Sequence, residues 1–407
     1  MKVQTLKGFR DITPPEALKR GRVLSLVKSV FKSYGFTPLE TPTIEYLEVL
    51  EGKYGQEGEK LMYRFKDRGG RDVALRYDFT VPLARYIAQN SGKITFPFKR
   101  YQIGSVFRAE KPQAGRYREF TQVDVDTVGI DSTLADAEIL AVFATALAVL
   151  GVKKFTIKVN DRDIFKTLPK KAVRILDKLD KIGEAGAKKE LEKAGFDAQN
   201  TLREIKKAKP TKRIEEIFAL LDEYGIDRKL VEFTPTLARG LDYYTGVIFE
   251  IITPTSRGAI AGGGRYDEMI GMFLPAGRQS SGTRIPAVGC SFGLDRLIEV
   301  VPTKTLEEIP FEPQVLVTIF SKELTGKSIE LFDQVQATGT EVELYLDPNE
   351  KLEKQLKYAD RKGITYALIL GPEEAKADSV TVKDLKKGTQ RTVTTQNLIN
   401  LLSAPAP

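Results

Sequence analysis

The chain has 407 residues, of which 42% are hydrophobic and 29% are charged, a composition typical of a globular protein with two or three domains. It contains no histidine and one cysteine, which excludes a Ser-His-Asp triad, a histidine-containing zinc site, a thiolate cluster and an internal disulfide. The formal net charge of +8 favours a polyanionic partner such as RNA or a phosphate-rich substrate.

No part of the sequence predicts a membrane-spanning helix or a secretory signal. The longest apolar stretch, residues 139–150, is shorter than the roughly 20 residues that a helix needs to cross a bilayer. Residues 1–11 alternate charged and polar side chains and lack the apolar core of a signal peptide. A single cysteine is typical of a reducing compartment. We therefore expect a cytoplasmic protein without a membrane partner.

The first third of the chain predicts helices on either side of a long β-hairpin. Apolar residues at helical spacing predict a helix over residues 16–33, and the prolines that follow predict an extended segment over residues 36–42. The polar, basic loop 111–117 separates two long extended runs, which predicts an antiparallel hairpin. The other expected elements are a helix over residues 80–90 and strands over residues 61–66, 72–76, 96–110 and 118–128.

The character of the sequence changes after a strong helix pattern over residues 131–150. Residues 161–230 are rich in Lys, Glu, Ala and Leu at helical spacing, and we interpret them as a helical insertion. Strand patterns then return, ahead of a glycine-rich run and a helix that begins near Phe292. The first domain is therefore expected to comprise residues 1–160 and 231–303.

The last part of the chain predicts a second domain. Pro310 and Pro313 punctuate a linker, which we place at residues 304–312. Beyond it, strand and helix patterns alternate, which predicts an α/β domain with parallel strand pairing over residues 313–403. The expected elements are helices over residues 325–337, 350–362 and 395–402, and strands over residues 315–320, 341–345, 366–370, 379–383 and 391–394.

The predicted hairpin carries side chains suited to a nucleotide. Arginines at strand ends can clamp phosphate oxygens, a glutamate can accept from an adenine amino group, and a phenylalanine can stack on the base. Charge alone fits a solvated hairpin face better. However, the glycine-spaced strand over residues 287–293 runs into a helix that carries Arg296, and this favours a triphosphate site. The hairpin residues concerned are Phe107, Arg108, Glu110, Arg116, Arg118 and Phe120.

Residues 239–250 join a cation, an acidic residue and two aromatic hydroxyls to an apolar strand, which predicts a site for a small polar ligand. Tyr243 and Tyr244 are adjacent on this predicted strand, so their side chains should face opposite sides. Only one of them can then point into a given pocket. We favour Tyr244 as the ligand-binding side chain and Tyr243 as a packing residue.

Several of these segments resemble the motifs of one enzyme class. Residues 107–110 (FRAE) and 293–296 (GLDR) resemble motifs 2 and 3 of class II aminoacyl-tRNA synthetases, and residues 35–42 resemble motif 1. Residues 239–244 (RGLDYY), followed by residues 263–267 (GGRYD), are similar to the two histidine-specific signatures of the histidyl-tRNA synthetase family. The resemblance covers nearly the whole chain, since that family is also matched at residues 75–85, 115–124 and 358–364.

The resemblance implies both a fold and an activity. The fold would be an α+β catalytic domain on a mixed, mainly antiparallel sheet, with a helical insertion and a C-terminal α/β anticodon-binding domain that reads exposed bases. The activity would be that of a histidine–tRNA ligase, which converts histidine and ATP to histidyl-adenylate and pyrophosphate and then transfers histidine to tRNA-His. The expected partners are L-histidine, ATP with Mg²⁺, tRNA-His and a second copy of the chain, with Pro42 near the dimer interface.

The resemblance also implies roles for residues around ATP. Arg108 would contact the α-phosphate and the amino-acid carboxylate, and Arg239 would neutralise charge as that carboxylate attacks. Because positioning and cationic screening supply most of the rate in phosphoryl chemistry, no histidine base is required. The remaining roles are Glu110 at the adenine amino group, Phe120 on the adenine face, Arg296 at the γ-phosphate, and Arg116 at the triphosphate or the tRNA acceptor end.

For histidine, the resemblance places Asp78 and Thr80 at the α-amino group. Asp126 can accept from one imidazole N–H while Tyr244 engages the other ring nitrogen, and an apolar rival would leave these groups unpaired. Many bacterial members have glutamate at positions 78 and 126, whereas aspartate resembles the archaeal and eukaryotic branch and alters the expected distances. The full set of expected histidine-binding residues is Asp78, Thr80, Arg108, Gln122, Asp126, Arg239, Tyr243, Tyr244 and Tyr266. No residue is assigned to hold a metal.

Two other functions stay open from the sequence. A synthetase-like regulatory subunit of histidine biosynthesis would bind histidine without ligase activity. Such paralogs usually lack the C-terminal domain and depart at the catalytic arginine, whereas this chain keeps both features. A class II synthetase for another amino acid is disfavoured by the segments around Arg239 and Tyr266.

Overall fold

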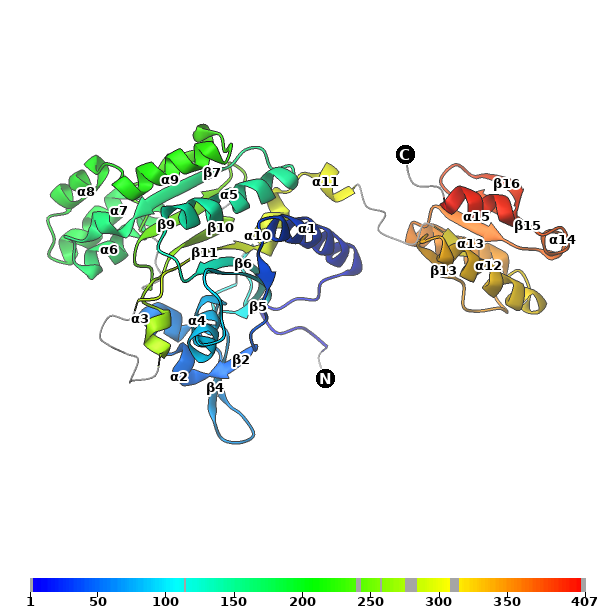
Figure 1. Cartoon of the computed structure of the whole chain (residues 1–407). Helices are drawn as coiled ribbons and strands as arrows, with labels where there is room; N and C mark the ends of the chain where they lie inside the picture. The colour runs from blue at the N-terminus through cyan, green and yellow to red at the C-terminus, as the bar shows by residue number, and fades with distance from the viewer. Residues whose placement is uncertain are drawn as a thin grey trace. The chain divides into compact units, whose positions relative to one another are not determined.

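The computed structural model describes residues 3–112, 115–238, 243–256, 258–274, 284–307 and 315–403 (Figure 1). The chain divides into two compact units, Met1–Leu306 and Glu307–Pro407. No helix in these described ranges combines the length and the apolar character that a membrane crossing requires.

A large sheet forms the centre of the first unit. Among the described residues it has eight strands, and the pairs at its two ends, β1 with β5 and β7 with β8, are parallel while all the others are antiparallel. This confirms the predicted mixed, mainly antiparallel sheet and its central hairpin. In spatial order the strands are β1 (Thr37–Pro38), β5 (Phe98–Phe107), β6 (Glu119–Val128), β11 (Ala287–Gly293), β10 (Ala261–Arg265), β9 (Val247–Ile252), β7 (Thr156–Asp161) and β8 (Val231–Phe233).

Three helices cover one face of this sheet: α1 (Pro14–Ser33), α5 (Thr133–Val149) and α9 (Lys212–Glu223) (Figure 1). Their apolar side chains join the alternate strand residues that point to the same face in one core, of which Val27, Phe143 and Ile217 are fully buried members. The short helices α10 (Leu294–Val300) and α11 (Thr303–Glu307) also contribute to this core, through Leu297 and Leu306. The opposite face of the sheet is not part of this core.

A second core lies against part of that opposite face. It is built from α4 (Thr80–Asn90), α2 (Leu47–Leu50) and the 3-10 helix η3 (Ile270–Phe273), together with the side chains of Tyr243, Tyr244 and Tyr266. A small antiparallel sheet adjoins it, with the order β2 (Ile44–Tyr46), β4 (Asp72–Leu75) and β3 (Arg64–Lys66), and α3 (Gly55–Lys60) lies between β2 and β3 in the chain. The predicted strand at residues 61–66 is therefore shorter than expected, and the predicted helix over residues 80–90 is confirmed.

The predicted insertion is helical. Helices α6 (Lys170–Leu176), α7 (Leu179–Lys193) and α8 (Ala198–Lys207) share a small core of their own, and α9 packs against α5. The 3-10 helices η1 (Arg162–Phe165) and η2 (Arg228–Leu230) connect these helices to the sheet. Next to the insertion, β7 is a strand in the large sheet, whereas the sequence analysis predicts no strand over residues 151–160.

The second unit is an α/β domain. Within residues 315–403 its sheet has the order β13 (Val342–Leu344), β12 (Val315–Val317), β14 (Tyr366–Ile369), β15 (Ser379–Asp384) and β16 (Thr389–Thr394). The first three strands are parallel, as predicted, and the last two add in antiparallel fashion. The helices are α12 (Thr325–Ala337), α13 (Leu352–Lys362), the unpredicted α14 (Pro372–Lys376), α15 (Thr395–Ser403) and the 3-10 helix η4 (Lys322–Leu324).

Candidate active site

A row of polar side chains lies on the sheet face opposite helices α1, α5 and α9. Side chains alternate along a strand, so Gln122, Asp124 and Asp126 of β6 share one face while Val123 and Val125 enter the helical core. The three polar residues are between 3% and 8% exposed. Two carboxylates and an amide at this depth require nearby partners, because a buried charge without compensation is costly.

One carboxylate oxygen of Asp126 is hydrogen-bonded, and the other, Oδ2, has an ion-pair partner but no hydrogen bond among the described residues. The Tyr266 hydroxyl donates to Oδ1, and Nη2 of Arg100 lies 2.7 Å from Oδ2. Gly289 stands directly opposite Asp126 in the sheet, and a Cβ atom there would lie 2.0 Å from Oδ1. Burial raises the pKa of Asp126, and Arg100 opposes that rise. The glycine thus makes room for the carboxylate, and the arginine compensates its charge.

Asp78 lies just before α4 and is 2% exposed. Its carboxylate accepts hydrogen bonds from the Tyr54 hydroxyl at 2.9 Å, the Tyr243 hydroxyl at 3.1 Å and the Val81 backbone N–H at 3.2 Å. Burial raises the pKa of Asp78, and the charge of Arg108 partly offsets this rise. Thr80, in the first turn of α4, is also buried.

Asp124 is a site residue that the sequence reasoning missed. The Ser291 hydroxyl donates to its Oδ1 at 2.5 Å, and Nε2 of Gln122 donates to the Ser291 hydroxyl at 2.8 Å. Burial raises the pKa of Asp124 to about 7, with Arg100 opposing the rise and Asp126 and Asp78 adding to it. The pKa of Asp124 thus depends on the charges of Asp78 and Asp126, so we treat the three carboxylates as one electrostatic site.

Arg108 lies between two aromatic rings. Its guanidinium carbon is 4.4 Å from the ring centre of Tyr77 and 5.1 Å from that of Phe120, and its Nε donates to the Tyr77 carbonyl oxygen at 3.1 Å. The hairpin tip beyond it is closed by an ion pair of 3.0 Å between Glu110 and Arg116. Glu110 is expected to bind adenine, and Arg116 is expected to bind the triphosphate or the tRNA acceptor end. In this structure the two side chains contact each other.

Arg296 lies at the opposite end of the polar row from Tyr266. It belongs to α10, which begins directly after Gly293, the residue opposite Gln122, and its Nη1 donates to the Ala259 carbonyl oxygen at 2.7 Å. Gln122 and Asp126 are four positions apart on β6, a span of roughly 13 Å. Arg296, expected at the phosphates, and Asp126, expected at the imidazole, therefore lie near different ends of β6, with Gln122 at the Arg296 end.

Two expectations for residues 239–250 have different outcomes. Arg239, the expected catalytic cation, lies outside the described residues, and the segment just before it is held by Asn160, whose amide donates to the carbonyl oxygens of Pro235 and Leu237. The prediction that Tyr243 and Tyr244 face opposite sides of a strand is wrong, because β9 begins only at Val247. Their buried rings lie 4.8 Å apart in one core.

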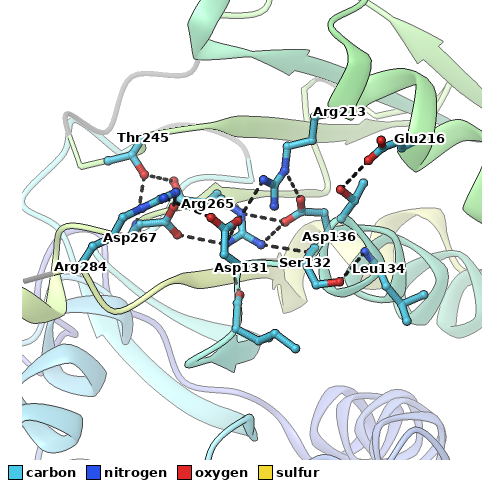
Figure 2. Close-up of polar contacts among 12 residues, drawn as sticks. Asp131, Ser132, Leu134, Asp136, Arg213, Glu216, Thr245, Arg265, Asp267 and Arg284 are labelled. Atoms are coloured by element: carbon cyan, nitrogen blue, oxygen red, sulfur yellow. Dashed lines mark hydrogen bonds and ion pairs between the residues drawn. The ribbon is translucent and has the colours of Figure 1, made fainter.

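An ion network surrounds Arg265, the residue that precedes Tyr266 in the chain (Figure 2). Arg265 is 1% exposed and bonds Asp136 of α5 through Nε and Nη2, at 3.0 and 2.7 Å, and Asp267 through Nη1 at 3.0 Å. Arg213 of α9 reaches Asp136 at 2.7 Å, and Arg284 pairs with Asp267 (Figure 2). Arg213 is therefore part of a structural network.

The sequence reasoning also missed Arg100, Tyr54 and Ser291. Asp124 lies two residues from both Gln122 and Asp126 on β6, so strand alternation was a usable signal for it. Tyr54 and Ser291 gave no such signal, because nothing in their local sequence marks them as partners of distant carboxylates.

Comparisons with known proteins identify the family. The family model described as "Histidyl-tRNA synthetase" matches residues 8–195 and 169–297. The family model described as "Anticodon binding domain" matches residues 314–404. A histidine–tRNA ligase of Cytophaga hutchinsonii is 37% identical over 454 aligned residues, which cover 97% of this chain and 98% of the relative. That of Rhodopirellula baltica is 38% identical over 421 residues, covering 94% and 93%. The crystal structure of histidyl-tRNA synthetase from Nostoc sp. PCC 7120 matches with a TM-score of 0.82 at 31% identity and covers 99% of both chains. This chain belongs to the histidyl-tRNA synthetase family.

Proposed function

We propose that the chain is a histidine–tRNA ligase whose amino-acid pocket lies at the Asp126 end of the polar row. The observation that carries this assignment is the buried set of Asp78, Asp126 and Tyr266 beside Arg108. Histidine offers an ammonium, a carboxylate and an imidazole. Asp78 is suited to the ammonium, Arg108 to the carboxylate, and Asp126 to an imidazole N–H, so each polar group of the ligand has a partner of matching charge.

Adenylate formation needs two anions to meet, because the histidine carboxylate attacks the α-phosphorus of ATP as pyrophosphate leaves. Arg108 would lie between the two groups and screen their charges, and Arg296 would hold the phosphates at the other end of the strand. Arg239 would act on the attacking carboxylate. The aromatic rings of Tyr77 and Phe120 fix the guanidinium of Arg108, so little reorganisation is needed during the reaction.

Mg²⁺ would neutralise phosphate charge in this scheme. Within the described residues no group of three or more acidic or cysteine side chains forms a preformed metal site. Mg²⁺ is usually bound by one or two carboxylates together with substrate phosphates. We therefore propose that the metal binds with ATP.

Selectivity for histidine would come from the polar groups of the pocket. An apolar amino acid would leave Asp126 and Tyr266 buried without a ligand partner, and unpaired groups of this kind can give discrimination of roughly 10⁴. Tyr243, which donates to Asp78, would orient the ammonium-binding carboxylate. Tyr244 packs on Tyr243 and is proposed for the second imidazole nitrogen.

The second unit is proposed to bind the anticodon of tRNA-His, in line with its family match. A net charge of +8 is suited to a tRNA ligand. A cytoplasmic location and a homodimer, with Pro42 near the interface, remain part of the proposal.

Amino-acid-dependent pyrophosphate exchange with all twenty amino acids, followed by charging of tRNA-His, tests the function. We expect exchange with histidine alone and transfer of histidine to the tRNA. Exchange with another amino acid would indicate a different class II synthetase. Histidine binding without exchange would indicate a regulatory subunit instead.

A further inference from the structure

Arg100 is a fully buried arginine at the floor of the proposed histidine pocket. It lies on β5 directly opposite Asp126, and its Nη2 is 2.7 Å from Asp126 Oδ2 and 3.5 Å from the Phe79 carbonyl oxygen. Strand register fixes this pairing, so the charge cannot move away from the carboxylate as it could on a loop.

Hydrogen bonding does not explain the burial of Arg100. Its Nε and Nη1 atoms are buried and have no hydrogen-bond partner among the described residues. Arg265, in the nearby network, donates from all three guanidinium nitrogens to Asp136 and Asp267. Under-satisfied buried polar groups call for an explanation, because each unpaired donor costs free energy. Arg265 has the contacts of a structural residue, and Arg100 does not.

The charges around Asp126 supply the explanation. Asp124 lies two residues away on β6, Asp78 lies before α4, and Tyr266 approaches from the end of β10. Burial and the charge of Asp78 raise the pKa of Asp126, whereas Arg100 and the Tyr266 hydroxyl lower it. Arg100 likewise opposes the rise in the pKa of Asp124. Among the described side chains Arg100 is thus the cation that acts on both Asp124 and Asp126, whereas Arg108 acts on Asp78.

We propose that Arg100 is a positioning residue for histidine recognition, which keeps Asp126 ionised and oriented so that it can accept the imidazole N–H. The inference rests on the proposed function. Without the guanidinium, burial and the neighbouring carboxylates would favour the protonated form of Asp126, which is a poorer acceptor. Arg100 would then determine affinity for histidine while leaving ATP binding to Arg108 and Arg296.

The test compares Arg100→Met with Arg100→Lys, which keeps a cation, in the full-length chain. Lys99→Met is the matched control, since Lys99 is the adjacent cation on the opposite sheet face, where it pairs with Glu138 at 2.7 Å. Histidine and ATP KM values are measured by pyrophosphate exchange between pH 7 and pH 9, histidine binding by calorimetry, and folding by thermal melting.

Arg100→Met is expected to raise the histidine KM at pH 7 at least about tenfold relative to wild type, and this ratio of KM values should shrink toward pH 9 as Asp126 ionises. ATP KM should change less than about twofold. For Arg100→Lys, the ratio of its histidine KM to that of wild type should not change with pH. For Lys99→Met, the histidine KM should equal that of wild type. A pH-independent loss in Arg100→Met, or equal losses in both Arg100 variants, would overturn the proposal.

Two further results keep the test decisive. If Arg100→Met does not fold, the histidine affinity of Arg100→Lys, measured by calorimetry, decides. A ratio of its dissociation constant to that of wild type that does not change with pH supports the role. A ratio that increases toward pH 7 refutes it. If wild type shows no histidine-dependent exchange and no histidine binding, the proposed function fails, and the inference fails with it.

Discussion

The three carboxylates of the candidate site differ in how their charge is compensated. Asp126 has a guanidinium and a phenol, Asp78 has three hydrogen-bond donors, and Asp124 has the Ser291 hydroxyl. Burial raises the pKa of Asp124 to about 7, and the charge of Arg100 and the Ser291 hydroxyl offset this rise only in part. In a chain without histidine, this carboxyl group is therefore a source of proton exchange near neutral pH.

Asp126→Asn tests the role of the pocket carboxylate. The amide carries no charge for Arg100 and can leave the imidazole N–H poorly paired, so the histidine KM should rise about a hundredfold or more while ATP KM stays within about threefold. Pyrophosphate exchange measures both values. Asp72→Asn, at an exposed ion pair with Lys66, serves as the control. Equal losses for histidine and ATP would mean that Asp126 has a structural role only.

Asp124→Asn tests the titration of the buried site. An acid whose pKa is higher in the folded chain stabilises the fold fully below its unfolded pKa, near 4, and loses that contribution as pH rises through about 7. Asparagine does not titrate, so the melting temperature of the variant minus that of wild type should increase by several degrees between pH 5.5 and pH 8.5. A difference independent of pH would contradict this assignment.

At the scale of elements, the network of Figure 2 joins three parts of the fold. Asp136 of α5 lies between Arg213 of α9 and Arg265 of β10, and Arg265 precedes Tyr266 in the chain. The last helix of the insertion is thereby tied to the strand that delivers a pocket residue. Because both side chains of the Arg265–Asp136 pair are buried, this contact is little screened by salt.

Asp136→Asn should destabilise the first unit by about 3 kcal/mol, since Arg213 and Arg265 lose a fully buried anion while Arg213 keeps Asp131 and Arg265 keeps Asp267. Denaturant unfolding followed by circular dichroism provides the measurement. Glu184→Gln, which breaks the exposed pair of Glu184 with Lys206 on the insertion, should cost less than about 1 kcal/mol. Similar costs for the two variants would show that burial does not distinguish these pairs.

Local patterns in the sequence predicted most elements, and the failures have physical causes. Helix α4 and the β5–β6 hairpin follow from apolar spacing and a polar loop, signals that lie within a few residues. Strand β7 was missed because its lysine and aspartate mask a short alternating pattern. The side-chain direction expected for Tyr243 and Tyr244 assumed a strand that starts later, at Val247. Arg100 and Asp124 look like exposed charges until the sheet shows that both are buried.

At the scale of the molecule, every described residue proposed to bind histidine or ATP lies in the first unit, Met1–Leu306. Its three hydrophobic cores are also complete within those residues. The second unit has separate cores and its own family match, to an anticodon-binding domain. Activation of the amino acid and selection of the tRNA are thus expected to be separable.

A chain truncated after Leu306 should keep histidine-dependent pyrophosphate exchange within about threefold of the full chain. Charging of tRNA-His should fall at least about tenfold, because lost contacts worth 1.4 kcal/mol already cost that factor. Residues 307–407 alone, as a control, should support neither reaction. Undiminished charging by the truncated chain would contradict the proposed anticodon role.

The central claim is that the buried end of the polar row binds the histidine side chain. A crystal structure of the full-length chain with a non-hydrolysable histidyl-adenylate analogue tests it most directly. We predict an imidazole nitrogen within about 3 Å of the Asp126 carboxylate, with the ligand ammonium at Asp78 and its phosphate at Arg108. An imidazole that lies away from Asp126, with this carboxylate contacting only Arg100 and Tyr266, would contradict the account.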